Sequence, residues 1–280
     1  MYTFLRGASY WAFAALALSG CEPVTPRRPG PTAATAPPAV QVAPDAGPPP
    51  AAPPRPSAAE ASSPPADVGV AFVERMTGGA APEAPAPLVV VVHGLGDTPE
   101  SFVELFEGLP FPARVVAVRG LDPFGDGWAW FPSGDADRLP AAFDRAVEAL
   151  ARALPALASR RPTCGLPVVV GFSQGAMLSF ALAARHPTLL RAAAPIAGRL
   201  PRAVGVSPGA LRRPEVVALH GTADDRIPFS RGQAAVALLR ANGYPASMFR
   251  AEGVGHTING PMARHLTATL QRWVGGGCAP

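Results

Sequence analysis

From about residue 68 to the C-terminus, apolar residues follow two alternating patterns. Short runs rich in valine and alanine indicate buried strands, and longer stretches with an apolar residue every three or four positions indicate helices. The expected strands are 70–76, 88–92, 114–118, 168–172, 192–196, 216–219 and 247–250. The expected helices are 99–107, 139–158, 176–185, 228–242 and 257–274. This alternation predicts an α/β fold with a mostly parallel central sheet, helices on both faces and no large lid domain.

The N-terminal residues do not follow this alternation. Residues 11–18 form an apolar run that is too short to span a membrane and fits the core of a secretory signal. The run ends in Leu-Ser-Gly-Cys at 18–21, which resembles a bacterial lipobox. That resemblance implies a signal peptide at 1–20 and a lipidated Cys21 on an exported, membrane-anchored lipoprotein, at the periplasmic face or the cell surface. The alternative is an ordinary secretory signal with an incidental cysteine.

Residues 22–67 consist mainly of proline and alanine and contain no aromatic side chain. Such a segment cannot bury a core, so we expect 21–67 to be the lipidated cysteine followed by a disordered linker. Proline-rich linkers are extended spacers of roughly 3 Å per residue. A recognition role for the prolines is the alternative. The remaining residues, 68–280, are long enough for one α/β domain with a substantial core.

The pentapeptide Gly-Phe-Ser-Gln-Gly at 171–175 has the pattern G-x-S-x-G and lies between an expected strand and an expected helix. That context predicts a nucleophile elbow, a strained turn that presents Ser173. Glycines suit this turn because a residue without a Cβ lets strand and helix approach closely. A plain turn serine is the alternative interpretation.

The partners of such a serine follow it along the chain in the order acid, then histidine. Asp224 and His256 each lie in a loop after an expected strand, where a parallel sheet places its site. His256 is expected to open the helix 257–274. The histidine takes the serine proton and returns it to the leaving group, and the carboxylate orients the imidazole. Asp225 is the alternative acid.

An oxyanion formed at Ser173 needs backbone N–H donors. We expect one donor to be Gln174, which follows the nucleophile, and the other to be Leu95 in the loop after the strand 88–92. His93 and His220 each precede a glycine at a strand end, so we expect them to hold these loops by hydrogen bonds.

Four motifs in this order resemble a known family. They are His93-Gly94-Leu95-Gly96-Asp97, Gly171-Phe172-Ser173-Gln174-Gly175-Ala176, His220-Gly221-Thr222-Ala223-Asp224 with Ile227-Pro228, and Gly255-His256. They are similar to the phospholipase/carboxylesterase family of α/β-hydrolases, which includes acyl-protein thioesterases. The resemblance covers the region from Val68 onward. It implies an α/β-hydrolase fold and a serine carboxylesterase or lysophospholipase-like hydrolase that cleaves short- to medium-chain acyl esters through an acyl-enzyme, without a cofactor. The family spacing after His220 favours Asp224 over Asp225.

The segment 127–131, Gly-Trp-Ala-Trp-Phe, is similar to the aromatic loop of that family. The resemblance places Trp130 and Phe131 in the substrate pocket. The alternative is that they, with Trp128, belong to the core or anchor the loop.

The charge pattern and the lack of metal-ligand spacings limit the classes of binding partner that we expect. The net charge is +4, the chain contains no lysine, and its arginines are scattered rather than gathered beside aromatic residues. We therefore expect no nucleic-acid binding. No C-x-x-C or H-E-x-x-H spacing occurs, so we expect no metal site. The expected partners are a small acyl-ester substrate and a membrane, through the lipid anchor.

Two cysteines outside the lipobox suggest a disulfide. Cys164 precedes the strand 168–172 and Cys278 follows the last helix. Strand starts and helix ends share one edge of a parallel sheet, and an exported protein enters an oxidising compartment. We predict a bond between the two, which requires Cα atoms within ~7 Å. Two free thiols are the alternative.

Two other functions fit the same motifs. One is a related serine hydrolase, such as a polyester depolymerase, a feruloyl esterase or a thioesterase. The other is a non-catalytic α/β-hydrolase that serves as a surface binding module. The second would be indicated by a missing member of the triad, and Ser173, Asp224 and His256 are all present.

Overall fold

The computed structural model describes residues 68–278, apart from residues 135 and 208. The predicted signal peptide, Cys21 and the proline-rich linker lie outside the described residues. Within the described part of the chain, each helix is too short or too polar to cross a membrane.

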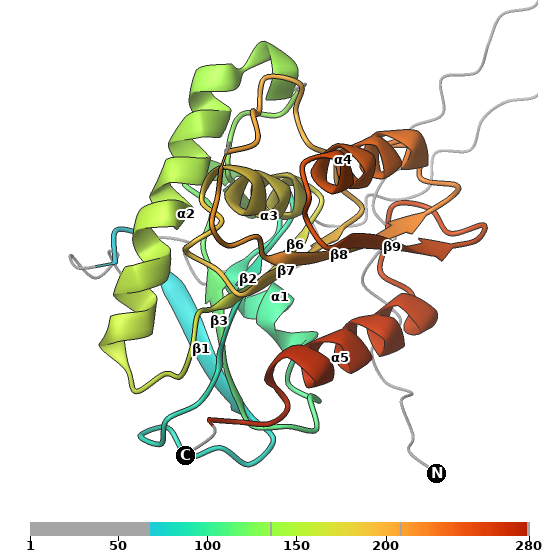
Figure 1. The fold of residues 1–280 in the computed structure, drawn as a ribbon. Coiled ribbons are helices and arrows are strands. Elements are labelled where there is room, and N and C mark those ends of the chain that lie inside the picture. The colour runs from blue at the N-terminus through green and yellow to red at the C-terminus, as the bar shows by residue number, and fades with distance from the viewer. Residues whose placement is uncertain (1–67, 135, 208, 279–280) are drawn as a thin grey trace, which may run out of the picture. The chain divides into compact units, whose positions relative to one another are not determined.

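A seven-stranded sheet organises the described residues, with the strand order β1-β3-β2-β6-β7-β8-β9 (Figure 1). Its strands are β1 (Phe72–Thr77), β2 (Leu88–Val92), β3 (Ala113–Val118), β6 (Val168–Phe172), β7 (Ala192–Ile196), β8 (Glu215–Gly221) and β9 (Ala246–Ala251). Neighbouring strands are parallel, except that β1 pairs antiparallel with β3 at one edge. The mostly parallel sheet predicted from the apolar runs is therefore confirmed.

Helices cover both faces of this sheet, and α3 and α4 lie on the opposite side from α1 and α5 (Figure 1). One face packs against α2 (Pro140–Arg160), α3 (Gln174–Arg185) and α4 (Phe229–Ala241), and the other packs against α1 (Pro99–Glu104) and α5 (Gly260–Val274). The residues of β2 divide between the two cores, because successive strand side chains point to opposite faces. Val90 and Val92 join the first core, and Val89 and Val91 join the second. All five residues of β2 are buried, which explains its uninterrupted apolar sequence.

One helix begins later than the sequence predicts. α5 starts at Gly260, where the side chain of Asn259 caps the helix by accepting the Met262 N–H at 3.0 Å. Pro261 stands in the first turn, a position that suits its fixed φ. His256 therefore lies in the loop before the helix and does not open it. The expectation of a helix from residue 257 is wrong, because the cap and the proline fix the start.

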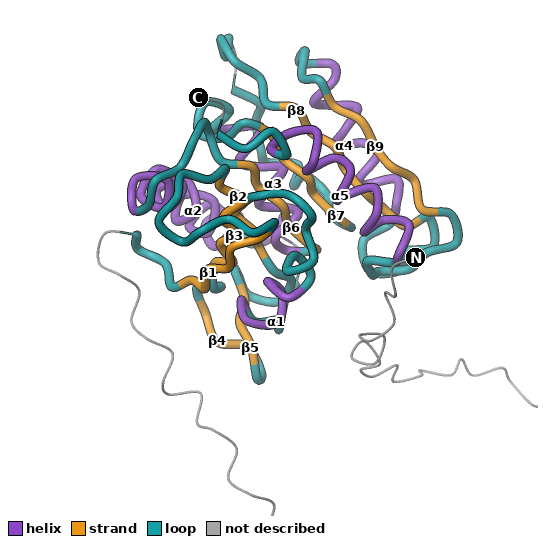
Figure 2. The backbone as a smooth tube through the Cα atoms, turned by 90° about the horizontal axis from the view of Figure 1, so that it is seen from below, coloured by secondary structure: helices purple, strands orange, loops and turns teal. Residues whose placement is uncertain are grey.

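A short hairpin was not predicted. β4 (Asp122–Phe124) and β5 (Gly127–Ala129) pair antiparallel and form a separate two-stranded sheet. Figure 2 shows this hairpin extending away from the seven-stranded sheet. Its two strands of three residues are too short to show a period in the sequence. The aromatic loop of the sequence analysis is thus the second half of a hairpin and the residues that follow it.

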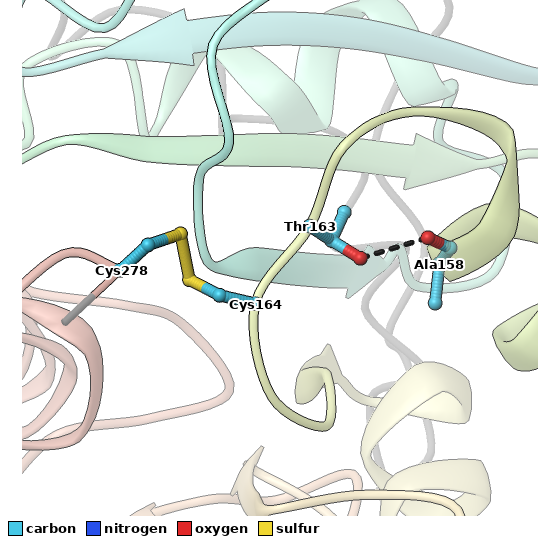
Figure 3. The surroundings of a disulfide bond; sticks show 4 residues. All are labelled: Ala158, Thr163, Cys164 and Cys278. Atoms are coloured by element: carbon cyan, nitrogen blue, oxygen red, sulfur yellow. Dashed lines mark hydrogen bonds between the residues drawn. A yellow bond between two sulfur atoms is a disulfide. The ribbon is translucent and has the colours of Figure 1, made fainter. Parts of the chain in front are cut away.

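A disulfide joins Cys164 to Cys278, with their Cα atoms 5.5 Å apart (Figure 3). Cys164 lies in the loop between α2 and β6, and Cys278 follows α5. The hydroxyl of Thr163 donates to the Ala158 carbonyl at 2.7 Å and holds the same loop to the end of α2. The bond forms between the two predicted cysteines, at the edge of the sheet where the parallel strands begin.

Candidate active site

Ser173 lies in the turn between β6 and α3 with a backbone φ of 55° and ψ of −112°. A positive φ is strained for a residue with a side chain, so the surrounding packing must hold it. A Cβ added at Gly171 would lie 2.1 Å from the Gly175 carbonyl oxygen, and one at Gly175 would lie 2.0 Å from that of Val92. Both glycines of the G-x-S-x-G pattern are therefore required by close backbone contacts, and the predicted elbow is formed.

His256 connects the serine to the acid. Its Nε2 lies 2.9 Å from Ser173 Oγ, and its Nδ1 lies 2.8 Å from Asp224 Oδ2. An ionised carboxylate only accepts hydrogen bonds, so Nδ1 carries the proton and Nε2 accepts the serine hydroxyl. The three residues form one hydrogen-bonded chain. Asp225 is exposed and takes no part in it, so the structure distinguishes the two candidate acids.

The Asp224 side chain is fully buried and its two oxygens are saturated with donors. The backbone N–H groups of Arg226 and Ile227 donate to Oδ1 at 3.0 and 2.8 Å. The Nε2–H of His220 donates to the Ile227 carbonyl at 2.8 Å, and the same nitrogen lies 3.2 Å from Oδ2. Burial alone raises the pKa of Asp224, but hydrogen bonds from His220, His256 and the Ile227 amide outweigh it and hold the pKa well below its usual range. The carboxylate therefore stays ionised beside the imidazole.

The loop of the acid and the loop of the histidine are joined by backbone contacts. The Thr222 N–H donates to the Ala251 carbonyl at 2.9 Å, and the Ala223 N–H donates to the Val254 carbonyl at 3.0 Å. A Cβ added at Gly221 would lie 2.1 Å from the Val254 oxygen. The distance between Asp224 and His256 is therefore set by main-chain packing rather than by the two side chains alone.

The two predicted oxyanion donors lie next to the nucleophile. Gln174 follows Ser173 directly, and a Cβ added at Gly94 would lie 3.4 Å from Ser173 Cβ, which places the loop of Leu95 against the elbow. Among the described residues, the Leu95 N–H makes no backbone hydrogen bond, and the Gln174 N–H stands at the first position of α3, where the helix itself offers no acceptor. Both amides are thus available for a substrate oxygen.

His93 holds the loop of Leu95 by two hydrogen bonds. Its Nδ1 donates to the Gly94 carbonyl at 2.6 Å, and its Nε2 accepts the Gly120 N–H at 3.0 Å. Burial lowers the pKa of His93 to about 4, and the hydrogen bond to Gly94 opposes this only in part. The ring is therefore neutral near pH 7, as its one donor and one acceptor require. His93 and His220 both hold loops by hydrogen bonds, in the role expected for them.

Trp130 and Phe131 are core residues. Their exposed fractions are 0% and 1%, and the Phe131 ring packs edge-to-face on Phe143 with centroids 5.4 Å apart. The indole of Trp130 donates to the His93 carbonyl at 3.1 Å. Their assignment to the substrate pocket is corrected, because neither side chain has a surface left for a ligand. Trp128 is half-buried, with the Arg119 guanidinium 4.0 Å above its ring.

Sequence reasoning missed the side chain of Gln174. Its Oε1 accepts the Trp130 N–H and its Nε2 donates to the Phe131 carbonyl, both at 3.0 Å. Nothing in the spacing of these residues signals the contact, because they lie more than 40 positions apart.

Among the described residues, no group of three or more histidine, cysteine or acidic side chains lies close enough together to hold a metal ion.

Comparison with known proteins gives consistent matches. The model of the family described as Phospholipase/Carboxylesterase matches residues 79–274, more than half of the chain. NocK of Nocardia uniformis subsp. tsuyamanensis is 34% identical over 162 residues, which cover 54% of this chain and 45% of NocK. The match spans less than half the length of each relative found by sequence.

Solved structures match over nearly their whole length. A carboxylesterase from Mesorhizobium loti is 26% identical, with a TM-score of 0.64, and the match covers 75% of this chain and 99% of that one. Esterase PE8 is also 26% identical with a TM-score of 0.64, over 73% of this chain and 99% of its own. These likenesses confirm the predicted α/β-hydrolase fold.

Proposed function

Because the chain belongs to the phospholipase/carboxylesterase family of α/β-hydrolases, we propose that it is a serine carboxylesterase. The observation that carries the proposal is the unbroken chain of hydrogen bonds from Ser173 Oγ through His256 to Asp224. A serine hydroxyl is a weak nucleophile unless a base takes its proton, and this geometry supplies the base already oriented by an ionised acid.

The reaction follows from the contacts. Ser173 Oγ attacks the ester carbonyl while His256 Nε2 takes the hydroxyl proton, and Asp224 stabilises the imidazolium. The N–H groups of Leu95 and Gln174 bind the oxyanion of the tetrahedral intermediate. The intermediate collapses, His256 protonates the departing alcohol, and an acyl-enzyme remains. Water, deprotonated by His256, then attacks the acyl-enzyme, and the second tetrahedral intermediate collapses as His256 returns the proton to Ser173 Oγ, which releases the carboxylic acid.

The proposed substrates are short- to medium-chain acyl esters. The loops that follow β2, β6 and β8 in the described residues are short, and no lid domain interrupts them. We infer from these short loops a site that small esters can enter, and the matched family supports a carboxylic ester as the substrate.

The first experiment compares the purified wild type with Ser173→Ala and with Ser247→Ala, a control on an exposed position of β9. A fluorophosphonate probe should label the wild type and Ser247→Ala but not Ser173→Ala. Turnover of p-nitrophenyl esters of increasing chain length should follow the labelling and fall by about 10⁴-fold or more in Ser173→Ala. A folded wild type that neither labels nor turns over would refute the esterase proposal and favour the binding module.

We also propose that the protein is an exported lipoprotein anchored through Cys21. The support is the string Leu-Ser-Gly-Cys at 18–21 and the proline-rich spacer after it, both outside the described residues. Stable anchoring requires more than one acyl chain. A clickable fatty acid should label the wild-type protein in cells and leave Cys21→Ser unlabelled. Labelling of both would contradict the proposal.

A further inference from the structure

The side-chain amide of Gln174 makes two hydrogen bonds that the proposed reaction does not use. It accepts from the backbone N–H of Trp130 and donates to the backbone carbonyl of Phe131, each at 3.0 Å. Gln174 is only 7% exposed, so both bonds form away from water, where leaving either one unmade is costly. The amide therefore satisfies one backbone donor and one backbone acceptor of this segment.

The backbone that Gln174 holds is fastened in turn to the loop of Leu95. The main chain of Trp128 exchanges two hydrogen bonds with the two residues that follow Leu95, at 2.9 and 3.0 Å. The indole of Trp130 donates at 3.1 Å to the carbonyl of His93, two residues before Leu95. Residues 128–131 thus contact the loop of Leu95 on both sides and the side chain of Gln174.

Both oxyanion donors are therefore connected to residues 128–131, each through different hydrogen bonds. Gln174 carries one donor on its backbone and binds the segment with its side chain, and the Leu95 loop binds the segment with its main chain. Donors of this kind act through preorganisation, which requires placement within about 0.5 Å. An amide is suited to the contact because it offers one acceptor and donors at the same end, whereas an ionised carboxylate only accepts.

We propose that the side chain of Gln174 is a positioning residue for the oxyanion hole. Through residues 128–131 it fixes the Leu95 N–H relative to the Gln174 N–H. The inference rests on the proposed esterase function, but the restraint it describes is measurable without any turnover. Gln174→Ala and Gln174→Met both keep the backbone N–H and remove the amide. Gln233→Ala, which removes an exposed glutamine from α4, is the matched control.

Hydrogen exchange tests the restraint directly. In Gln174→Ala and Gln174→Met, the amides of Gly96 and Trp128, whose hydrogen bonds join the two segments, should exchange at least about tenfold faster than in the wild type, because these bonds open more often. Exchange in α5 and in the Gln233→Ala control should be unchanged. Equal exchange rates in the wild type and both Gln174 variants would overturn the inference, whatever the activity.

Kinetics test the consequence for catalysis. Active sites are counted by titration with the fluorophosphonate probe, and kcat is expressed per titrated site. We expect kcat in Gln174→Ala to fall about 10- to 100-fold, while KM stays within about twofold of the wild type. This loss is smaller than the roughly 10²- to 10³-fold loss in kcat that follows the removal of an oxyanion donor. A boronic acid inhibitor, which forms a tetrahedral adduct, should weaken by the same factor as kcat.

The same measurements separate positioning from a merely structural role. A structural role would lower the fraction of titratable sites and leave kcat per site unchanged, and that result would overturn the inference. If the wild type itself fails to label, the esterase proposal falls, while the exchange rates still decide whether Gln174 restrains the loop of Leu95.

Discussion

At the scale of single residues, Asp224 is the most heavily bonded side chain of the site. We predict that Asp224→Asn lowers kcat by about 10⁴-fold, because an amide favours the wrong tautomer of His256. Asp225→Asn, one residue away and exposed, should stay within about twofold of the wild type. Both variants are assayed on the same p-nitrophenyl ester. Similar losses in the two variants would contradict the assignment of the acid.

His93 makes stability depend on pH. Its pKa is about 4 in the folded protein against an ordinary value of 6.5, so the unfolded chain binds more protons between these values. The neutral ring makes its full contribution to the free energy of unfolding above pH 6.5. This contribution, roughly 3 kcal/mol in total, is lost as the pH falls through about 4. His93→Gln, which keeps a donor and an acceptor but does not titrate, should reduce this loss.

Urea unfolding at pH 7 and at pH 4.5 measures the effect of His93. The difference in free energy of unfolding between the two pH values should shrink in His93→Gln. Gln233→Ala, which removes an exposed and non-titrating side chain from α4, serves as the control and should leave the difference unchanged. An identical pH dependence in the wild type and His93→Gln would contradict the prediction.

Sequence reasoning placed some side chains of the site and not others. Ser173, Asp224 and His256 were identifiable because the order of their motifs carries the chemistry, and the structure brings them into one hydrogen-bonded chain. Trp130 was misplaced because a motif gives a position along the chain but not the direction of a side chain. The contacts of the Gln174 side chain were invisible because they depend on the fold.

At the scale of elements, the strand–turn–helix unit around Ser173 has no room for a side chain at Gly171 or Gly175. We predict that Gly175→Ala lowers the free energy of unfolding by about 1–3 kcal/mol and lowers kcat, because its Cβ would lie 2.0 Å from the Val92 carbonyl oxygen. Gly205→Ala, where nothing lies within 4 Å of the added Cβ, is the control. Urea denaturation measures the stability of the two variants. Equal unfolding midpoints for Gly175→Ala and Gly205→Ala would contradict the prediction.

The elements that the sequence predicted well are those whose residues are all buried. β2, β6 and β7 have the boundaries expected from their apolar runs, since both faces of each strand pack into a core. The hairpin of β4 and β5 carries glycine, proline and acidic residues and leaves no apolar period to find. The late start of α5 comes from the capping side chain of Asn259, while Ile258, four residues before the buried Met262, continues the apolar pattern of the helix.

At the scale of the whole described region, the disulfide links residues 114 positions apart. Replacing both cysteines by serine should cost about 2–4 kcal/mol, since a long loop in the unfolded chain is then no longer closed. Esterase activity at 25 °C should stay near that of the wild type, because the bond lies at the opposite edge of the sheet from Ser173. Urea unfolding is the measurement, and a reductant should shift the wild type to the midpoint of the double variant. An unchanged midpoint would contradict the prediction.

The position of that disulfide along the chain has a topological consequence. Ser173, Asp224 and His256 all lie between Cys164 and Cys278, so the bond closes a covalent ring that contains the nucleophile, the base and the acid. Leu95 lies outside the ring. A single proteolytic cut in any loop between Cys164 and Cys278 opens the ring, but the disulfide still joins the two resulting pieces of chain. The complete triad then stays on one covalently connected molecule, which divides in two only after reduction.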